Sequence, residues 1–136
     1  MRAMPRFGPL MVSGMMISAA ILAGGLSRRM GKDKAFVPFE GRPMALAVAR
    51  LLKRATGAVP FVVSKSPKKY ESLALPLVKD EMPQMSELAG IHAALAHTKT
   101  SRVLIATCDQ PFLSIKLLRA MIRTPGDVVV CEIDHR

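Results

Sequence analysis

Aromatic residues are scarce in this sequence, which contains no tryptophan, one tyrosine and five phenylalanines. Proteins that bind nucleic acids usually stack bases on aromatic rings, so this scarcity argues against a nucleic-acid partner. Acidic residues are also few: ten of them stand against twenty lysines and arginines, which gives a formal charge of +10. The cations are spread along the chain rather than gathered in one block. This distribution favours a phosphorylated small molecule as the anionic partner.

Cysteine is equally rare, since only Cys108 and Cys131 are present. Their separation matches no metal-site spacing, and each adjoins an apolar run typical of a strand. We therefore expect two buried free thiols rather than a disulfide. That expectation indicates a reducing compartment and a cytoplasmic protein.

Charged residues are absent from residues 7–27, a span long enough for a signal peptide or a membrane helix. Glycine, proline and serine dilute its apolar character, and its last third continues into a glycine-rich loop without a cleavage-type boundary. A buried parallel strand also reads as a continuous apolar run, so we expect a strand and no stable membrane insertion. Because Met16 can serve as a true start, we assign residues 1–15 to an N-terminal extension prone to disorder. Residues 16–136 form one domain.

Strand and helix patterns alternate along the chain, which predicts an α/β domain with a mostly parallel sheet covered by helices. The strand-like segments are residues 17–23, 59–63, 75–78, 101–107 and 128–130. The longer helix-like segments are residues 44–54, 86–97 and 113–123. In the second of these helices the apolar positions at helical spacing are Leu88, Ile91 and Leu95. Gly57 is expected to stop the first helix.

A glycine-rich basic loop follows the first predicted strand. It contains Gly24, Gly25 and Gly31 together with four cations, two of which are Arg28 and Lys34. Glycine lets backbone N–H groups approach a ligand closely, and cations on the same loop complement an anion. The loop therefore predicts a phosphate cradle. An ordinary solvated turn of the same composition is the alternative.

Two carboxylates follow later strands, where an open α/β sheet binds its ligands. Asp80 comes after the segment 75–78, and Asp109 comes directly after the segment 101–107. A carboxylate at a strand end can hold Mg²⁺, which completes its shell with water and phosphate oxygens. The combination predicts a site for a nucleoside triphosphate. The alternatives are a turn or helix-capping role for Asp109 and a solvated loop for Asp80.

The spacing excludes two common nucleotide motifs. A P-loop needs a longer glycine interval and a hydroxyl residue after its lysine, whereas Asp33 follows Lys32 here. A dinucleotide-binding fingerprint needs Gly-x-Gly-x-x-Gly, which Gly24 and Gly25 do not provide.

Three segments carry a family resemblance. Residues 22–34 (LAGGLSRRMGKDK) resemble the signature loop of the molybdenum cofactor guanylyltransferases, the MobA family. Residues 88–91 (LAGI) are similar to the segment after the family's nucleotide-contacting aspartate, and residues 108–112 (CDQPF) to its metal-binding aspartate motif. The segments occur in the family's order and cover most of residues 16–136.

The resemblance implies a Rossmann-like three-layer sandwich of the nucleotide-diphospho-sugar transferase type. It also implies Mg²⁺-dependent transfer of GMP from GTP to the phosphate of molybdopterin, with release of pyrophosphate. Such chemistry requires positioning and charge neutralisation but no protein nucleophile. The double glycine favours GTP over CTP as a family pattern.

The resemblance also assigns roles by position. Arg28, Lys34 and Asp109 would be catalytic, with Arg28 steadying the pyrophosphate and Asp109 holding Mg²⁺. The nucleotide would be bound by Leu22, Ala23, Gly24, Gly25, Lys34, Asp80 and Asp109.

The chain departs from the family pattern in two places. Ser86 and Glu87 stand where members usually have Gly-Pro, and the sequence stops soon after the predicted strand 128–130. Members continue with a part that completes the sheet and the acceptor pocket, so we expect a domain that is incomplete at its C-terminus. Two alternatives remain open: a related enzyme that uses CTP or another phosphorylated acceptor, and a nucleotide-binding remnant without turnover.

Overall fold

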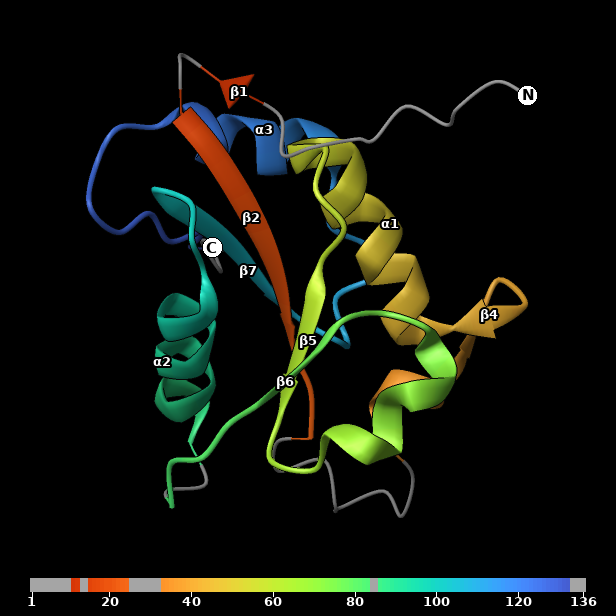
Figure 1. Ribbon diagram of the computed structural model, residues 1–136. Coiled ribbons are helices and arrows are strands. Elements are labelled where there is room, and N and C mark those ends of the chain that lie inside the picture. Colours follow the sequence, from red (N-terminus) through yellow and green to blue (C-terminus); the bar gives the residue numbers. More distant parts are fainter. Residues whose placement is uncertain (1–10, 13–14, 25–32, 84–85, 133–136) are drawn as a thin grey trace, which may run out of the picture.

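A four-stranded parallel sheet forms the centre of the protein in the computed structural model, which describes residues 11–12, 15–24, 33–83 and 86–132. Its strands lie in the order β7-β2-β5-β6, with bounds Arg102–Thr107, Met15–Leu22, Phe61–Ser64 and Leu77–Lys79. A short strand β1 (Met11–Val12) pairs antiparallel with the start of β2 (Figure 1). The predicted α/β fold with a mostly parallel sheet is thus confirmed.

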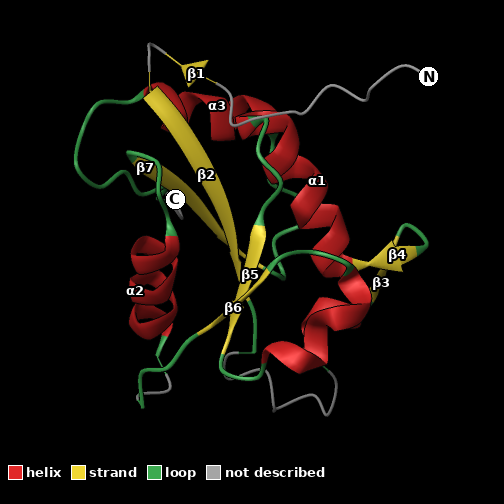
Figure 2. Ribbon diagram, in the orientation of Figure 1, coloured by secondary structure: helices red, strands yellow, loops and turns green. Residues whose placement is uncertain are grey.

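Helices cover both faces of this sheet and make three layers. The helices α1 (Met44–Thr56) and α3 (Ile115–Arg123) pack on one face, and α2 (Glu87–His97) packs on the other (Figure 2). A short hairpin of β3 (Pro38–Phe39) and β4 (Arg42–Pro43) precedes α1. Two 3-10 helices, η2 (Lys34–Phe36) and η3 (Pro67–Leu73), occupy connections after β2 and β5.

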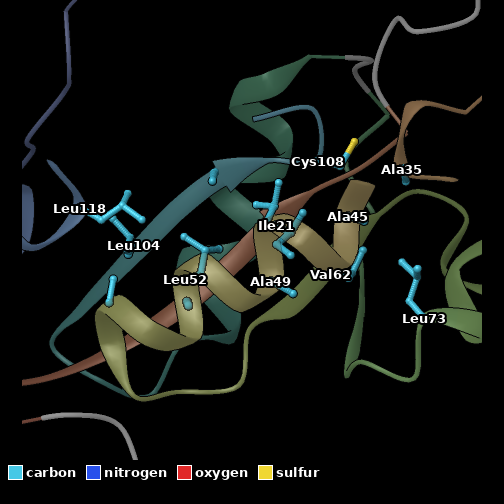
Figure 3. Packing of buried hydrophobic residues seen from close by; sticks show 14 of the residues in the cluster. Ile21, Ala35, Ala45, Ala49, Leu52, Val62, Leu73, Leu104, Cys108 and Leu118 are labelled. Atoms are coloured by element: carbon cyan, nitrogen blue, oxygen red, sulfur yellow. The ribbon is translucent and has the colours of Figure 1, made fainter. Parts of the chain in front are cut away.

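Strand β2 is buried on both faces, which explains its unbroken apolar sequence. Its residues Ile17, Ala19 and Ile21 belong to the core beneath α1 and α3, whereas Ala20 belongs to the smaller core beneath α2. Figure 3 shows the larger core, in which Ile21 of β2 lies beside Leu52 and Ala49 of α1. The apolar span expected to be a strand is therefore the central strand. Among the described residues, no helix has the length and apolar character needed to cross a membrane.

Helix α1 ends where the sequence predicts. Gly57 adopts the left-handed conformation with φ of 76°, and its N–H donates to the Lys53 carbonyl at 2.7 Å. Glycine adopts this conformation without a steric penalty, so it closes the last turn of the helix.

Helix α2 presents a different face to the sheet from the one that its apolar spacing suggests. Leu88 is 76% exposed and Leu95 is 58% exposed, whereas Ala89, Gly90 and Ala94 are buried. A Cβ added to Gly90 would lie 3.2 Å from Cδ2 of Leu22 at the end of β2. The small residues face inward because they let the helix approach the strand closely, so side-chain size decides this face.

Two further expectations are wrong. Residues 128–130 form no strand, because the segment 125–132 contains no regular secondary structure and Val128 and Val130 are about 80% exposed. Valine favours strands only when a neighbouring strand and a packing surface are available. Cys108 is a buried free thiol as expected, but Cys131 lies exposed in this same segment.

The boundary between the extension and the domain at residue 16 remains a prediction, since residues 1–10 and 13–14 lie outside the described part.

Candidate functional site

The loops after β2 and β7 meet at one edge of the sheet. Leu22 pairs in register with Thr107, and the N–H of Cys108 donates to the Leu22 carbonyl at 3.2 Å. The chain after Leu22 and the chain after Thr107 therefore leave the sheet side by side. Parallel sheets of this kind bind ligands at the carboxyl ends of their strands.

Lys34 and Asp109 lie together at this edge, as the sequence predicts for two residues of one site. The Lys34 Nζ atom is 3.3 Å from Asp109 Oδ2, and the Thr107 hydroxyl donates to Asp109 Oδ1 at 2.7 Å. The hydrogen bond from Thr107 and the nearby Lys34 ammonium hold the pKa of the Asp109 carboxyl below its usual range, against a smaller effect of burial. Both side chains are about 40% exposed, so a ligand in solvent can reach an ammonium and a carboxylate at neutral pH.

The residues that hold Lys34 were missed by the sequence reasoning. Asp33 begins η2, and its Oδ1 accepts the Ala35 N–H at 3.0 Å. The Tyr70 hydroxyl, from η3, donates to the other oxygen, Asp33 Oδ2, at 2.6 Å. Burial, followed by the Asp33 carboxylate, raises the pKa of Tyr70, which therefore stays protonated as the donor. The one signal in the sequence was that the chain's single tyrosine lies in an otherwise polar segment.

The end of β2 presents backbone rather than side chains. The Ala23 N–H donates to the Val63 carbonyl at 3.0 Å, which extends the sheet by one residue. Gly24 has a φ of 83°, and a Cβ at this position would lie 3.1 Å from the Tyr70 hydroxyl oxygen. Leu22 is half-buried and packs in the core beneath α2. Gly25 and Arg28, also expected in the site, lie outside the described residues.

Asp80 lies apart from the other site residues. It follows β6, three strand spacings from β7, or about 14 Å along the sheet. Its side chain is 6% exposed; Oδ2 accepts from the Lys65 ammonium at 3.2 Å and Oδ1 from the Met82 N–H at 3.0 Å. The ammonium also donates to the Met82 carbonyl. The carboxylate is thus engaged within the chain, by a lysine to which the sequence gave no role.

Cys108 is the first residue after β7, but it is not suited to nucleophilic chemistry. Burial, followed by the neighbouring Asp109 carboxylate, raises the pKa of its thiol to about 11. The thiol is therefore neutral at physiological pH, and thiolate is the nucleophilic form.

The described residues fit a Mg²⁺ site in which substrate phosphates supply part of the coordination shell. They contain no group of three or more histidine, cysteine, aspartate or glutamate side chains suited to a metal. Asp109 offers one anionic, half-exposed carboxylate, and Mg²⁺ commonly takes one or two carboxylates while water and phosphate oxygens complete its shell. A metal here would depend on the nucleotide.

Residues 19–136 match the family model described as the MobA-like NTP transferase domain. The chain belongs to this family. Among curated relatives, this MobA-like domain is 38% identical over 122 residues to a probable molybdenum cofactor guanylyltransferase of Clostridium perfringens, covering 88% of the chain and 61% of the relative. It is also 38% identical over 113 residues to the molybdenum cofactor guanylyltransferase of Cupriavidus metallidurans, covering 82% and 56%. The chain therefore spans about three fifths of the length of these relatives.

Solved structures agree with this assignment. The molybdopterin-guanine dinucleotide biosynthesis protein A of Archaeoglobus fulgidus superposes with a TM-score of 0.61 at 27% identity, over 78% of this MobA-like domain and 53% of that chain. The structure of a hypothetical transferase from Thermus thermophilus superposes with a TM-score of 0.57 at 32% identity, over 82% of this domain and 48% of that chain. The family resemblance predicted from the signature loop is thus confirmed.

Proposed function

We propose that this MobA-like domain binds GTP with Mg²⁺ and takes part in transferring GMP to the phosphate of molybdopterin, which forms a guanine dinucleotide and releases pyrophosphate. The observation that carries the proposal is the Lys34–Asp109 pair beside the glycine end of β2. A cation for phosphate and a carboxylate for a metal lie at the one sheet edge where such ligands bind. The names of the relatives support the guanylyl group and the molybdopterin acceptor.

Each described residue has a part in this reaction. The backbone from Leu22 to Gly24 borders the nucleotide, and Gly24 has no Cβ that would keep the nucleotide away from the backbone. Lys34 binds the triphosphate oxygens as its ammonium exchanges Asp109 for phosphate, and it stabilises the negative charge on the departing pyrophosphate. Asp109 remains anionic and would hold Mg²⁺, which neutralises phosphate charge when bound. The acceptor phosphate is the nucleophile, so the neutral Cys108 thiol takes no part.

Asp80 has a more indirect role in this proposal. Its carboxylate is already bonded to Lys65 and to the Met82 N–H, so it orders the loop that follows β6. A nucleoside lying across the sheet edge from Asp109 would reach this loop. Direct contact between Asp80 and the nucleoside requires the carboxylate to accept a further hydrogen bond beside the two that it has.

Thermal denaturation with the four nucleoside triphosphates tests the proposal. With Mg²⁺ and GTP at about 100 times Kd, binding contributes about 2.7 kcal/mol, which raises Tm by roughly 8 °C for a domain of this size. Lys34→Met and Asp109→Asn should remove most of this shift. Lys99→Met is the matched control, because Lys99 is exposed and precedes β7, at the opposite end of that strand from Asp109. A larger shift with CTP, or no shift with any triphosphate, would contradict the choice of GTP.

A second candidate is a nucleotide-binding module without turnover, because the Lys34–Asp109 pair and the end of β2 suffice for a phosphate site and no role on the acceptor is assigned to a described residue. It predicts the same thermal shift but no pyrophosphate when molybdopterin is added with GTP and Mg²⁺. A pyrophosphate-release assay on the same protein separates the two candidates.

A further inference from the structure

The Tyr70 hydroxyl occupies an unusual place in the site. Tyr70 is fully buried, yet its oxygen lies at the site edge of the sheet, bonded to Asp33 Oδ2 at 2.6 Å. The same oxygen would be 3.1 Å from a Cβ on Gly24. Gly24 and Asp33 are the described residues on either side of residues 25–32. A single buried hydroxyl therefore contacts the end of β2 and the start of η2.

Asp33 links this contact to Lys34, because its hydrogen bonds fix the turn in which Lys34 lies. Its two carboxylate oxygens are used in different directions: Oδ2 accepts from Tyr70 and Oδ1 accepts from the Ala35 N–H. The Asp33 carbonyl accepts from the Phe36 N–H at 3.1 Å, which closes the first turn of η2. Lys34 is the first residue of this turn. Its backbone is thus held on both sides, although its own side chain is long and flexible.

Ring packing supports the same arrangement. The rings of Tyr70 and Phe36 stack with a centroid separation of 5.7 Å and an angle of 5° between their planes. Phe36 is the last residue of η2, so η3 holds this short helix at its start through a hydrogen bond and at its end through a ring contact.

The bond to Tyr70 also engages the carboxylate that is next to Lys34 in the chain. Asp33 and Asp109 are both acidic neighbours of this region, but the Lys34 ammonium pairs with Asp109 at 3.3 Å. Tyr70 and the Ala35 N–H occupy the Asp33 oxygens and hold that carboxylate in a different direction. Without the hydroxyl, Asp33 Oδ2 is released and can compete for the ammonium, since opposite charges a few ångströms apart attract.

We propose that Tyr70 is a positioning residue for Lys34: through Asp33 its hydroxyl fixes the start of η2 and keeps the Lys34 ammonium beside Asp109, aimed at the phosphates of a bound nucleotide. The consequence for nucleotide binding rests on the proposed function. The geometric part stands on the described contacts alone.

Tyr70→Phe is the direct test, because it removes the hydroxyl and keeps the ring that stacks on Phe36. Ser101→Ala is the matched control: its hydroxyl donates to the Met16 carbonyl at the opposite end of the sheet. Titrations with GTP, GDP and GMP in the presence of Mg²⁺ should show that Tyr70→Phe weakens GTP binding about tenfold and GMP binding less than twofold. The effect grows with the number of phosphates because Lys34 acts on phosphates. Ser101→Ala should change none of the three affinities.

Equal weakening of all three nucleotides would show that Tyr70 merely supports the fold, and unchanged affinities would show that it has no role; either result overturns the proposal. Asp33→Asn combined with Tyr70→Phe should weaken GTP binding less than Tyr70→Phe alone, because the uncharged amide does not compete with Asp109 for the Lys34 ammonium.

A readout that needs no nucleotide separates this proposal from the function on which it rests. In the ¹⁵N-labelled protein, the Nζ resonance of Lys34 should shift when Asp109 is changed to Asn, and Tyr70→Phe should move it in the same way. If the wild-type chain binds no triphosphate, the proposed function fails while this resonance still decides the role of Tyr70. A Lys34 resonance that ignores Tyr70→Phe would overturn the positioning role.

Discussion

The Lys65–Asp80 pair is more buried than the Lys34–Asp109 pair, and its two members differ in their access to solvent. The Asp80 side chain is 6% exposed, whereas the Lys65 side chain is 28% exposed. A buried charge that loses its partner keeps its desolvation cost, whereas a partly exposed charge can be hydrated again. The two partners should therefore respond differently to substitution.

We expect Lys65→Met to cost about 3 kcal/mol of unfolding free energy, because it leaves the Asp80 carboxylate buried with one hydrogen bond. Asp80→Asn should cost about 1 kcal/mol, since an amide oxygen can still accept from the Met82 N–H and Lys65 can turn to solvent. Urea denaturation of both variants measures the difference. Equal losses of unfolding free energy in the two variants would contradict the idea that the buried Asp80 depends on Lys65 more than Lys65 depends on Asp80.

The same pair of variants tests the nucleoside role of Asp80. If Asp80 contacts the nucleoside, Asp80→Asn should weaken GTP binding more than Lys65→Met does, in the reverse order of their effects on stability. If it only orders the loop after β6, the more destabilising variant should also bind GTP more weakly.

Site residues that belong to a sequence motif could be predicted, whereas residues that reach the site only through tertiary packing could not. Lys34 and Asp109 follow from the signature loop and from the position after a strand, and the structure brings them together. Tyr70 and Lys65 come from segments with no motif, so their contacts depend on how η3 and β6 pack beside the loops. Of their partners, Asp80 was predicted as a site residue and Asp33 was not, and neither contact could be read from the sequence.

At the scale of elements, α2 shows why hydrophobic spacing alone gave the wrong face. Only small residues, Gly90 and Ala94, fit between the helix and β2, and Leu88 and Leu95 point away from the sheet. The existence and length of the helix were nevertheless predicted within one residue, because Ser86 caps it by accepting the Ala89 N–H at 3.3 Å. The strand expected at 128–130 failed for the opposite reason: its residues suit a strand, but no described strand lies beside them.

Neighbouring residues of α2 provide a matched test of this orientation. Ala94→Gln should lower the unfolding free energy by about 3 kcal/mol, because it forces a longer polar side chain into a fully buried position. Leu95→Gln should change it by less than about 0.5 kcal/mol, because Leu95 is exposed. Urea denaturation compares the two, and a larger cost at Leu95 would mean that the helix is turned as its apolar spacing suggested.

At the scale of the whole molecule, the surplus of positive charge is concentrated on helices as well as on the loop. Neither α1 nor α3 contains an acidic residue, and exposed cations of these two helices include Arg50, Arg54, Lys116, Arg119 and Arg123. Like charges repel across such a surface, and salt weakens the repulsion as the Debye length falls from about 30 Å at 0.01 M to about 8 Å at 0.15 M.

We therefore expect Tm to rise by a few degrees between 10 and 150 mM KCl. Pyrophosphate at matched ionic strength should raise it further, because it also binds at Lys34, and this extra increment should disappear in Lys34→Met while the response to KCl remains. A Tm that falls with KCl would contradict the repulsion. Equal responses to chloride and pyrophosphate would contradict a specific anion site.

During synthesis, the central strand β2 emerges from the ribosome well before its second neighbour. Residues 20–22 pair on one side with residues 61–63 of β5, and residues 17–22 pair on the other side with residues 102–107 of β7. Because synthesis adds ~5–20 residues per second, several seconds pass between the emergence of β5 and that of β7. In that interval an apolar strand edge stays open, and such edges recruit other chains. The pairing that brings Asp109 to the end of β2 thus makes the nascent chain dependent on a slow, late contact for its solubility.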